Sequence, residues 1–233
     1  MTDLSYIDRN VGKVREKIEK AAIAAGRDPM DITLLAAVKY AEPEEIQRLY
    51  DCGIRTVGEN RVQQYIEHSA IEGYDRFGVH FIGTLQTNKV KYLVGNVDVI
   101  ESLDSERLAA EIDKVSKKKN TVTDVLCEIN CGREPNKSGV MPEDVEELCE
   151  KIKDFPNLRL RGFMTMAPLG ATKEEYRKYF RETCRLSLDI WRKTIHNIER
   201  EPILSMGMSG SFEEAILEGA NTVRVGRSLF EKN

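Results

Sequence analysis

Short apolar runs alternate with longer amphipathic segments along almost the whole chain, and this alternation restricts the possible folds more than any other feature. Eight runs have the length and composition of buried strands: 32–38, 56–60, 79–83, 97–102, 124–130, 158–166, 203–208 and 222–226. Helices are expected between them, at 43–52, 61–71, 87–94, 105–118, 142–153, 173–195 and 212–218. Because strands that alternate with helices pair in parallel, the pattern predicts an α/β fold.

Eight such units within 233 residues favour a closed (β/α)8 barrel, the TIM barrel. The alternative is a doubly wound open sheet, which more often has five or six strands, and no GxGxxG fingerprint follows the first run. An extra N-terminal helix is predicted because Val11, Val14 and Ile18 recur at helical spacing, with Gly26 and Pro29 ending it. The last strand is expected to run to the end of the chain without a helix after it.

Composition excludes several classes of protein. The net charge is -4, and 41% hydrophobic and 32% charged residues are ordinary values for a soluble globular chain. Apolar runs such as 34–38 fall far short of the ~20 residues that a membrane span needs, and the first residues lack the features of a secretory signal. Since no linker or low-complexity segment interrupts the pattern, residues 1–233 are expected to form one domain.

The cysteines, histidines and basic residues indicate the redox environment and argue against metal and nucleic-acid binding. The five cysteines contain no CxxC pair, which favours reduced thiols in a cytoplasmic protein. His68, His80 and His196 lie far apart, so no metal site is expected. The basic run at 117–119 stands where a helix should end and there complements the helix dipole; the alternative, a nucleic-acid patch, suits an acidic chain poorly.

Lys39 is the most unusual residue, because it follows five apolar residues at the expected carboxyl end of the first strand. Strand alternation puts Leu35, Ala37 and Lys39 on one face, and the small Ala37 leaves room beneath the amine. If that face is the barrel interior, desolvation makes the amine available to form an imine with an aldehyde. The alternative is a lysine that extends its ammonium group into solvent.

A phosphate site is predicted after the seventh and eighth strands, where this fold repeatedly binds phosphate. Residues 209–211 (Ser-Gly-Ser) precede a helix and leave backbone N–H groups free for an anion. Gly226 has no side chain to block its amide. The alternative is purely structural: Ser211 and Glu214 form a capping box at the start of the helix, and Gly226 is only a turn residue. A second capping box is expected from Thr172 and Glu175.

Arg224 lies two residues before Gly226 and is expected to point into the barrel. A buried guanidinium needs a partner, which is either a bound ligand or a structural ion pair with a residue such as Glu59. A lysine, a phosphate cradle and an inward arginine together favour an aldehyde-bearing phosphorylated cofactor, of which pyridoxal 5′-phosphate (PLP) is the obvious one.

The chain also resembles a known family, the pyridoxal phosphate homeostasis proteins of the YggS/PROSC type. The resemblance runs in order from the first helix to the last strand. It rests on Lys39 and on the motifs at 58–60, 80–83, 85–89, 162–166, 205–209 and 223–226. It implies a barrel of the alanine racemase type, which is fold type III of the PLP-dependent proteins.

The resemblance further implies six cofactor-binding residues: Lys39, Asn60, Ser209, Arg224, Gly226 and Arg227. PLP would be held as an imine on Lys39. Ser209 and the backbone at 226–227 would contact the phosphate, while Arg224 would face the pyridine nitrogen. Asn60 is implied to be a neighbour of the cofactor.

Two functions remain in competition. An arginine at the pyridine nitrogen only donates hydrogen bonds, so the ring is a poor electron sink, which argues against transamination. A PLP-dependent racemase needs a second acid–base group, but adjacent strand residues point to opposite faces, which places Tyr40 poorly. The barrel also leaves no residues for a second domain. Largely on the resemblance to this family, we expect a non-enzymatic carrier or buffer of PLP that serves PLP-dependent apoenzymes, and we expect it to be a monomer.

A third class, a barrel with only a structural or partner-binding role, would show no PLP chromophore. Among the lesser candidates, Lys137 stands in a loop and either meets phosphate or substrate or is solvent-exposed. Tyr176, Phe180 and Trp191 have the spacing of a helix packing face. Four methionines line the cofactor or fill the interior: Met164, Met166, Met206 and Met208.

Overall fold

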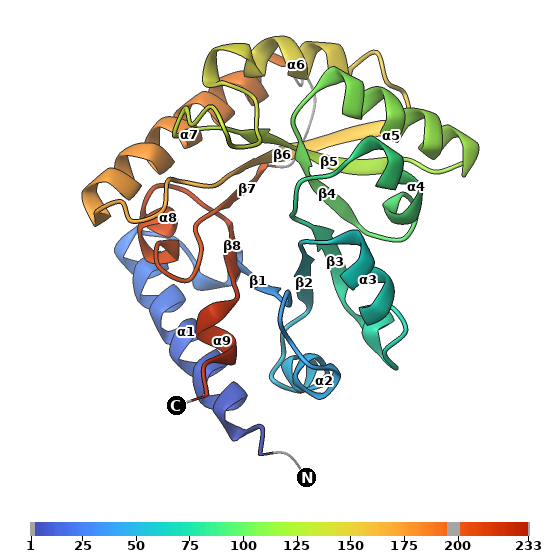
Figure 1. Ribbon diagram of the computed structural model, residues 1–233. Coiled ribbons are helices and arrows are strands. Elements are labelled where there is room, and N and C mark those ends of the chain that lie inside the picture. Colours follow the sequence, from blue (N-terminus) through green and yellow to red (C-terminus); the bar gives the residue numbers. More distant parts are fainter. Residues whose placement is uncertain (1–2, 195–200, 233) are drawn as a thin grey trace.

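The computed structural model describes residues 3–194 and 201–232, in which eight parallel strands close into a barrel (Figure 1). The strands are β1 (Thr33–Ala37), β2 (Thr56–Glu59), β3 (Gly78–Phe81), β4 (Val99–Leu103), β5 (Thr123–Ile129), β6 (Leu158–Thr165), β7 (Ile203–Met206) and β8 (Thr222–Val225). Each strand pairs with the next, and β8 pairs with β1. The predicted closed barrel is confirmed, and the open sheet is wrong.

Helices surround the barrel (Figure 1). They are α1 (Ser5–Ala24), α2 (Pro43–Asp51), α3 (Val62–His68), α4 (Val90–Leu93), α5 (Glu106–Lys118), α6 (Val145–Ile152), α7 (Lys173–Thr194), α8 (Phe212–Leu217) and α9 (Arg227–Phe230). The described residues also contain four short 3-10 turns: η1 (Pro29–Asp31), η2 (Tyr74–Arg76), η3 (Thr87–Lys89) and η4 (Pro142–Asp144). Each predicted helix is present; η3 and α4 divide the one at 87–94, and residue 195 lies outside the described residues.

Two local expectations were wrong. The last strand does not run to the end of the described chain, because the backbone turns at Gly226 and Leu229 N–H donates to the Gly226 carbonyl at 2.8 Å, which starts α9. Ser211 does not cap α8, because its hydroxyl instead accepts from Met208 N–H at 3.2 Å. The expected capping box of Thr172 and Glu175 is confirmed.

The extra helix α1 is the predicted one, and its end follows from one residue. Gly26 adopts φ +69°, a left-handed conformation that glycine takes without strain, and Arg27 N–H then donates to the Ala22 carbonyl at 2.9 Å. The buried face of α1 includes Ile7, Val11 and Val14. Figure 1 shows α1 lying beside α9, and α1 also packs on α8.

Two kinds of side chain fill the barrel. The main apolar core lies between the strands and the helices, while a separate small cluster of Val99, Leu126 and Met164 packs with Ile203. Residues two positions further along these strands share the same face and stand nearer the carboxyl ends. On β4, β5 and β7 these residues are polar and buried: Glu101, Glu128 and Ser205. The barrel interior is therefore apolar in its lower part and charged beneath its mouth.

Candidate functional site

One cavity of about 630 Å³ lies beyond the carboxyl ends of β1, β2, β7 and β8. All six predicted cofactor-binding residues line it: Lys39, Asn60, Ser209, Arg224, Gly226 and Arg227. Residues that are distant in the sequence meet here because parallel strands present their carboxyl ends at the same end of a barrel. Ile82, Met166 and Met208 add apolar walls.

Lys39 stands in the turn after β1 and is half-buried. Ala37, the last residue of β1, lines the same cavity. The lysine Nζ lies 4.7 Å from the centroid of the Tyr40 ring. Tyr40 also lines the cavity, and the expectation that it points away is wrong, because β1 ends at Ala37 and strand alternation does not extend into the turn.

The lysine also changes the chemistry of its neighbour. A hydrogen bond with Lys39 and the positive charge of its amine lower the pKa of the Tyr40 phenol. Tyr40 nevertheless remains 79% exposed, so this phenol is open to solvent. The two side chains thus form one amine–phenol pair at the rim.

In the loops after β7 and β8, beside the end of β1, backbone amides converge on Ser209. Its hydroxyl accepts from Gly226 N–H at 3.3 Å and from Ser228 N–H at 3.4 Å, which ties the loop after β7 to the first turn of α9. These bonds are long, so an anion can take the same donors. A Cβ on Gly226 would lie 3.1 Å from the Ala37 carbonyl, so a side chain here would push β8 slightly away from β1.

Arg224 lines the cavity from inside the barrel and is 3% exposed. One terminal nitrogen donates to the Ser205 carbonyl at 2.6 Å and to the Ser205 hydroxyl at 2.8 Å, and the other donates to the Thr165 carbonyl at 2.8 Å. Burial lowers the pKa of the guanidinium, while the charges of Glu101 and Glu128 raise it. Carbonyl bonds on two sides fix the plane of this group.

The alternative ion pair between Arg224 and Glu59 is not formed. Glu59 instead accepts from the Tyr74 hydroxyl at 2.5 Å and lies 2.7 Å from Nδ1 of His68. Gly58 has its Cβ position against the side chain of Leu35 inside the barrel, so the next residue points outward to the helices. The expected inward orientation of Arg224 is confirmed, but its partners are different.

A buried polar chain beneath the cavity was missed at the level of sequence. Glu101 accepts from the Ser205 hydroxyl at 2.6 Å and lies 2.6 Å from Nδ1 of His80, so Ser205 links it to Arg224. Burial alone would raise the pKa of Glu101, but His80, Arg224 and Ser205 outweigh it and leave the pKa lowered. The available signal was a charged residue inside the apolar run of β4.

The lesser candidates divide between the cavity and its surroundings. Met166, Met208 and Tyr176 line the cavity. Tyr176 also packs on Phe180 as expected, with the two ring centroids 6.1 Å apart. Lys137 is exposed and lines a smaller neighbouring cavity. Within residues 3–194 and 201–232 no cluster of three acidic, cysteine or histidine residues could hold a metal, and His196 lies outside them.

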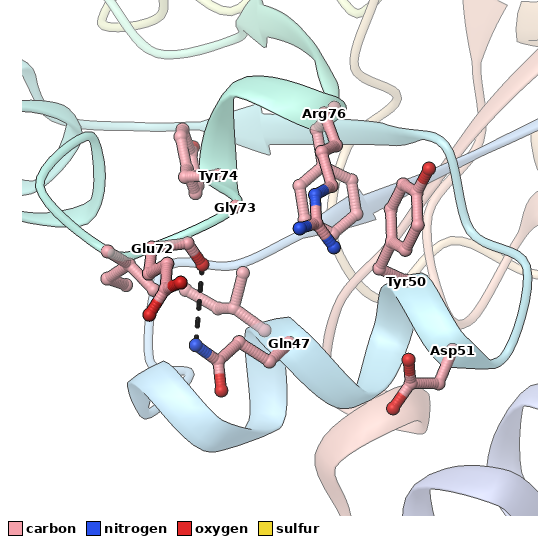
Figure 2. A pocket seen from close by; sticks show the side chains of 10 residues that line it. Gln47, Tyr50, Asp51, Glu72, Gly73, Tyr74 and Arg76 are labelled. Carbon is pink, nitrogen blue, oxygen red and sulfur yellow. Dashed lines mark hydrogen bonds between the residues drawn. The ribbon is translucent and has the colours of Figure 1, made fainter.

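Figure 2 shows a different pocket, of about 270 Å³, between α2 and the segment that leads into β3. Gln47 donates to the Glu72 carbonyl at 3.3 Å, and the guanidinium carbon of Arg76 lies 5.7 Å from the centroid of the Tyr50 ring. The segments of this pocket precede β2 and β3, so it lies at the amino ends of the strands. Since function in this fold collects at the carboxyl ends, the larger cavity is the candidate site.

None of the helices in the described residues is long and apolar enough to cross a membrane.

Comparisons with known proteins agree with the fold and point to a family. The family described as "Alanine racemase, N-terminal domain" matches residues 2–233. A pyridoxal phosphate homeostasis protein of Aquifex aeolicus is 46% identical over 221 residues, which cover 94% of this chain and 95% of that protein.

Two solved structures extend the comparison. An unknown protein from Bifidobacterium adolescentis superposes with a TM-score of 0.92 at 32% identity, covering 99% of this chain and 97% of that chain. PipY of Synechococcus elongatus, solved with PLP bound, has a TM-score of 0.78 at 29% identity, covering 92% of this chain and 100% of that chain.

Proposed function

The chain belongs to the pyridoxal phosphate homeostasis protein family, and we propose that it binds PLP at the mouth of its barrel and acts as a carrier or buffer of this cofactor. One observation carries the proposal: a single cavity is lined by an amine, a buried guanidinium and a hydroxyl with converging amides. These groups suit an aldehyde, a ring nitrogen and a phosphate. The name of the Aquifex aeolicus relative and the PLP bound to PipY support the same reading.

Each end of the cavity has a chemical role. PLP supplies an aldehyde that reacts reversibly with a primary amine, and Lys39 is the amine that lines the cavity. Its nitrogen would bond to the aldehyde carbon, with loss of water. Ser209 and the backbone amides at Gly226 and Arg227 bind the phosphate, since N–H groups at the start of a helical turn favour an anion. Asn60, which also lines the cavity, would lie beside the ring.

Arg224 sets the electronic character of the bound ring. A guanidinium only donates hydrogen bonds, so the pyridine nitrogen it faces stays unprotonated. Ser205 and Thr165 hold the guanidinium, which cannot turn away without breaking buried hydrogen bonds. A ring that is a poor electron sink suits storage of PLP better than transamination.

The racemase alternative requires two acid–base groups on opposite faces of the ring. Tyr40 is the tyrosine nearest in sequence to Lys39, and the two side chains touch in one turn, which is unfavourable for attack from two sides. We therefore infer a cytoplasmic, monomeric carrier without substantial turnover, in which residues 1–233 act as one PLP-binding domain.

An absorbance titration of apoprotein with PLP tests the binding site. The wild type is expected to develop the band of lysine-bound PLP, and Lys39→Ala is expected to lack it. Lys114→Ala, which removes an exposed amine of α5, is the matched control and should keep the band. A wild type without the band, or a Lys39→Ala protein that retains it, contradicts the assignment.

Two further measurements separate carriage from catalysis and test the partners. Racemisation of an amino acid at ~1 per second or faster would contradict the carrier. PLP-dependent apoenzymes are proposed to receive the cofactor from this protein. Transfer to such an apoenzyme should outpace release of PLP into bulk solvent, and equal rates would rule out directed delivery.

A further inference from the structure

One side chain of α3 holds the turn that carries Lys39. Lys39 and Tyr40 are the two central residues of this turn, which Ala41 N–H closes by donating to the Val38 carbonyl at 3.0 Å. The side-chain amide of Gln64 donates a hydrogen bond to the Lys39 carbonyl from outside the turn. This bond joins α3 directly to the residue that carries the amine.

The helix that carries Gln64 is itself fixed in place. In α3 the Tyr65 hydroxyl donates to the Asn96 carbonyl at 2.8 Å. Nδ1 of His68 lies 2.7 Å from a carboxylate oxygen of Glu59, which is the last residue of β2. Neither contact involves the turn after β1. Gln64 therefore acts from a helix that is anchored independently of Lys39.

The oxygen of the same side-chain amide has no partner. Oε1 of Gln64 is buried and accepts no hydrogen bond within residues 3–194 and 201–232. A buried oxygen without a donor destabilises the folded state, and an apolar side chain of similar length would avoid that cost. Stability alone therefore does not explain an amide at this position, whereas the bond to the Lys39 carbonyl gives the amide a role.

That bond controls the direction of two side chains. A peptide unit is planar, so a fixed Lys39 carbonyl also fixes the plane that joins Lys39 to Tyr40. Rotation of this plane changes ψ of Lys39 and φ of Tyr40, which would redirect both side chains. In the structure both side chains line the large cavity, with Lys39 Nζ 4.7 Å from the centroid of the Tyr40 ring.

We propose that Gln64 is a positioning residue for the Lys39 amine. By holding the Lys39 carbonyl, it keeps the amine beside the Tyr40 ring and inside the cavity, where the amine can meet an aldehyde. The consequence for PLP binding rests on the proposed function. The position of the amine does not, because it can be measured in the apoprotein.

Gln64→Met and Gln63→Met make the matched comparison. Methionine has nearly the length of glutamine but no N–H donor, so Gln64→Met removes the bond with little change in shape. Gln63 is the preceding residue of α3, is exposed and donates to Glu67 at 3.3 Å. Gln64→Leu, which also lacks the donor, is a second variant with the same expected effect.

Reductive methylation of the apoprotein with ¹³C-formaldehyde measures the position of the amine. The resonance that is absent from Lys39→Arg belongs to Lys39. In the wild type its methyl protons are expected to be shifted upfield, because the amine lies over the Tyr40 ring. Gln64→Met should lose most of this ring-current shift, and Gln63→Met should keep it. A role in stability alone would leave the shift unchanged.

The PLP titration measures the consequence. Gln64→Met should weaken PLP binding ~5-fold or more and slow the appearance of the band of lysine-bound PLP, because a misplaced amine meets the aldehyde less often. The thermal midpoint should stay within ~4 °C of the wild type, since the variant loses one hydrogen bond and one unsatisfied oxygen together. Gln63→Met should match the wild type in both measurements.

The proposal is wrong if the Lys39 resonance keeps its shift in Gln64→Met and Gln64→Leu, or if Gln63→Met displaces it equally. A thermal midpoint that falls well beyond this range, with the shift retained, would mean a purely structural role. A wild type without the PLP band, in which Gln64→Met still displaces the Lys39 resonance, would refute only the proposed function. The reverse pattern would refute only the role of Gln64.

Discussion

At the scale of single residues, the electrostatics of the site depend on how one buried cation is held. Arg224 reaches Glu101 through the Ser205 hydroxyl, and Glu101 continues the chain to His80. Removing one member of a buried charged pair leaves the other without compensation, which costs more than the pair itself contributes. The polar chain therefore both positions the guanidinium and depends on every member being present.

Glu101→Gln tests this dependence. The folded state lowers the pKa of Glu101 below its ordinary value of 4.5, so its stabilising contribution is present above that value and lost as the pH falls through the lowered one. At pH 7 we expect the free energy of unfolding to fall by about 3 kcal/mol. The decline of wild-type stability below pH 4.5 should be shallower in the variant.

Urea denaturation at several pH values measures both effects. Glu146→Gln is the control, because Glu146 forms an exposed pair with Lys193 at 3.3 Å, and such pairs contribute less than about 1 kcal/mol. If Glu101→Gln behaves like this surface variant, the buried chain has no energetic importance.

At the scale of elements, β6 sets the geometry of the mouth through an irregularity. The register between β5 and β6 shifts between Val125 and Leu126, where Gly162 enters the pairing. Gly162 has φ +149°, and a Cβ there would clash with the backbone of Ile203 on β7. Beyond this point Thr165 presents the carbonyl that holds Arg224. A glycine near the middle of the strand thus allows β5, β6 and β7 to approach.

Gly162→Ala is expected to lower the free energy of unfolding by about 3 kcal/mol, because the added carbon meets backbone atoms that cannot rotate away. Gly12→Ala is the matched control. Gly12 lies in α1 with open space around its Cβ position, so alanine should stabilise the helix by up to about 1 kcal/mol. Chemical denaturation compares the two, and equal effects would mean that the close approach at Gly162 relaxes freely.

At the scale of the whole molecule, the first and last helices of the described residues, α1 and α9, meet beside the candidate site. The buried Asn10 of α1 donates to the Leu229 carbonyl at 3.2 Å and to the Glu231 carbonyl at 2.9 Å. Gly226 and Arg227, at the start of α9, line the cavity. Figure 1 shows α1 running past both α8 and α9. Closure of the barrel between β1 and β8 therefore brings Lys39 and the start of α9 to one cavity.

Asn10→Ala removes one buried and one part-buried hydrogen bond, which end in α9 and just after it. We expect a loss of about 2 kcal/mol in unfolding free energy and several-fold weaker PLP binding, because α9 loses its anchor. Asn96→Ala, which removes an exposed bond to the Tyr92 carbonyl, is the control. Fluorescence-detected denaturation and PLP titration measure the two effects, and unchanged PLP affinity would mean that α9 holds its position unaided.

Much of the fold was predictable because its signals are local. Apolar runs, helical periodicity and the glycine at 26 each act within a few residues, so all eight strands and the extra helix could be placed from the sequence. The barrel then brings strand ends together, which predicts that Lys39, Ser209 and Gly226 share one cavity. Their contacts with PLP remain a prediction for titration.

The remaining features depend on contacts between distant segments. Arg224 could pair with Glu59 or reach Glu101, and the choice depends on which side chains face it inside the barrel. No local sequence pattern encodes which residues from distant strands meet there. The orientation of Tyr40 likewise depends on where β1 ends. Sequence alone determined the order of the elements and which strand ends carry reactive groups. Tertiary structure decided the partners of each buried charge, because the free energy of a charge depends on everything packed around it.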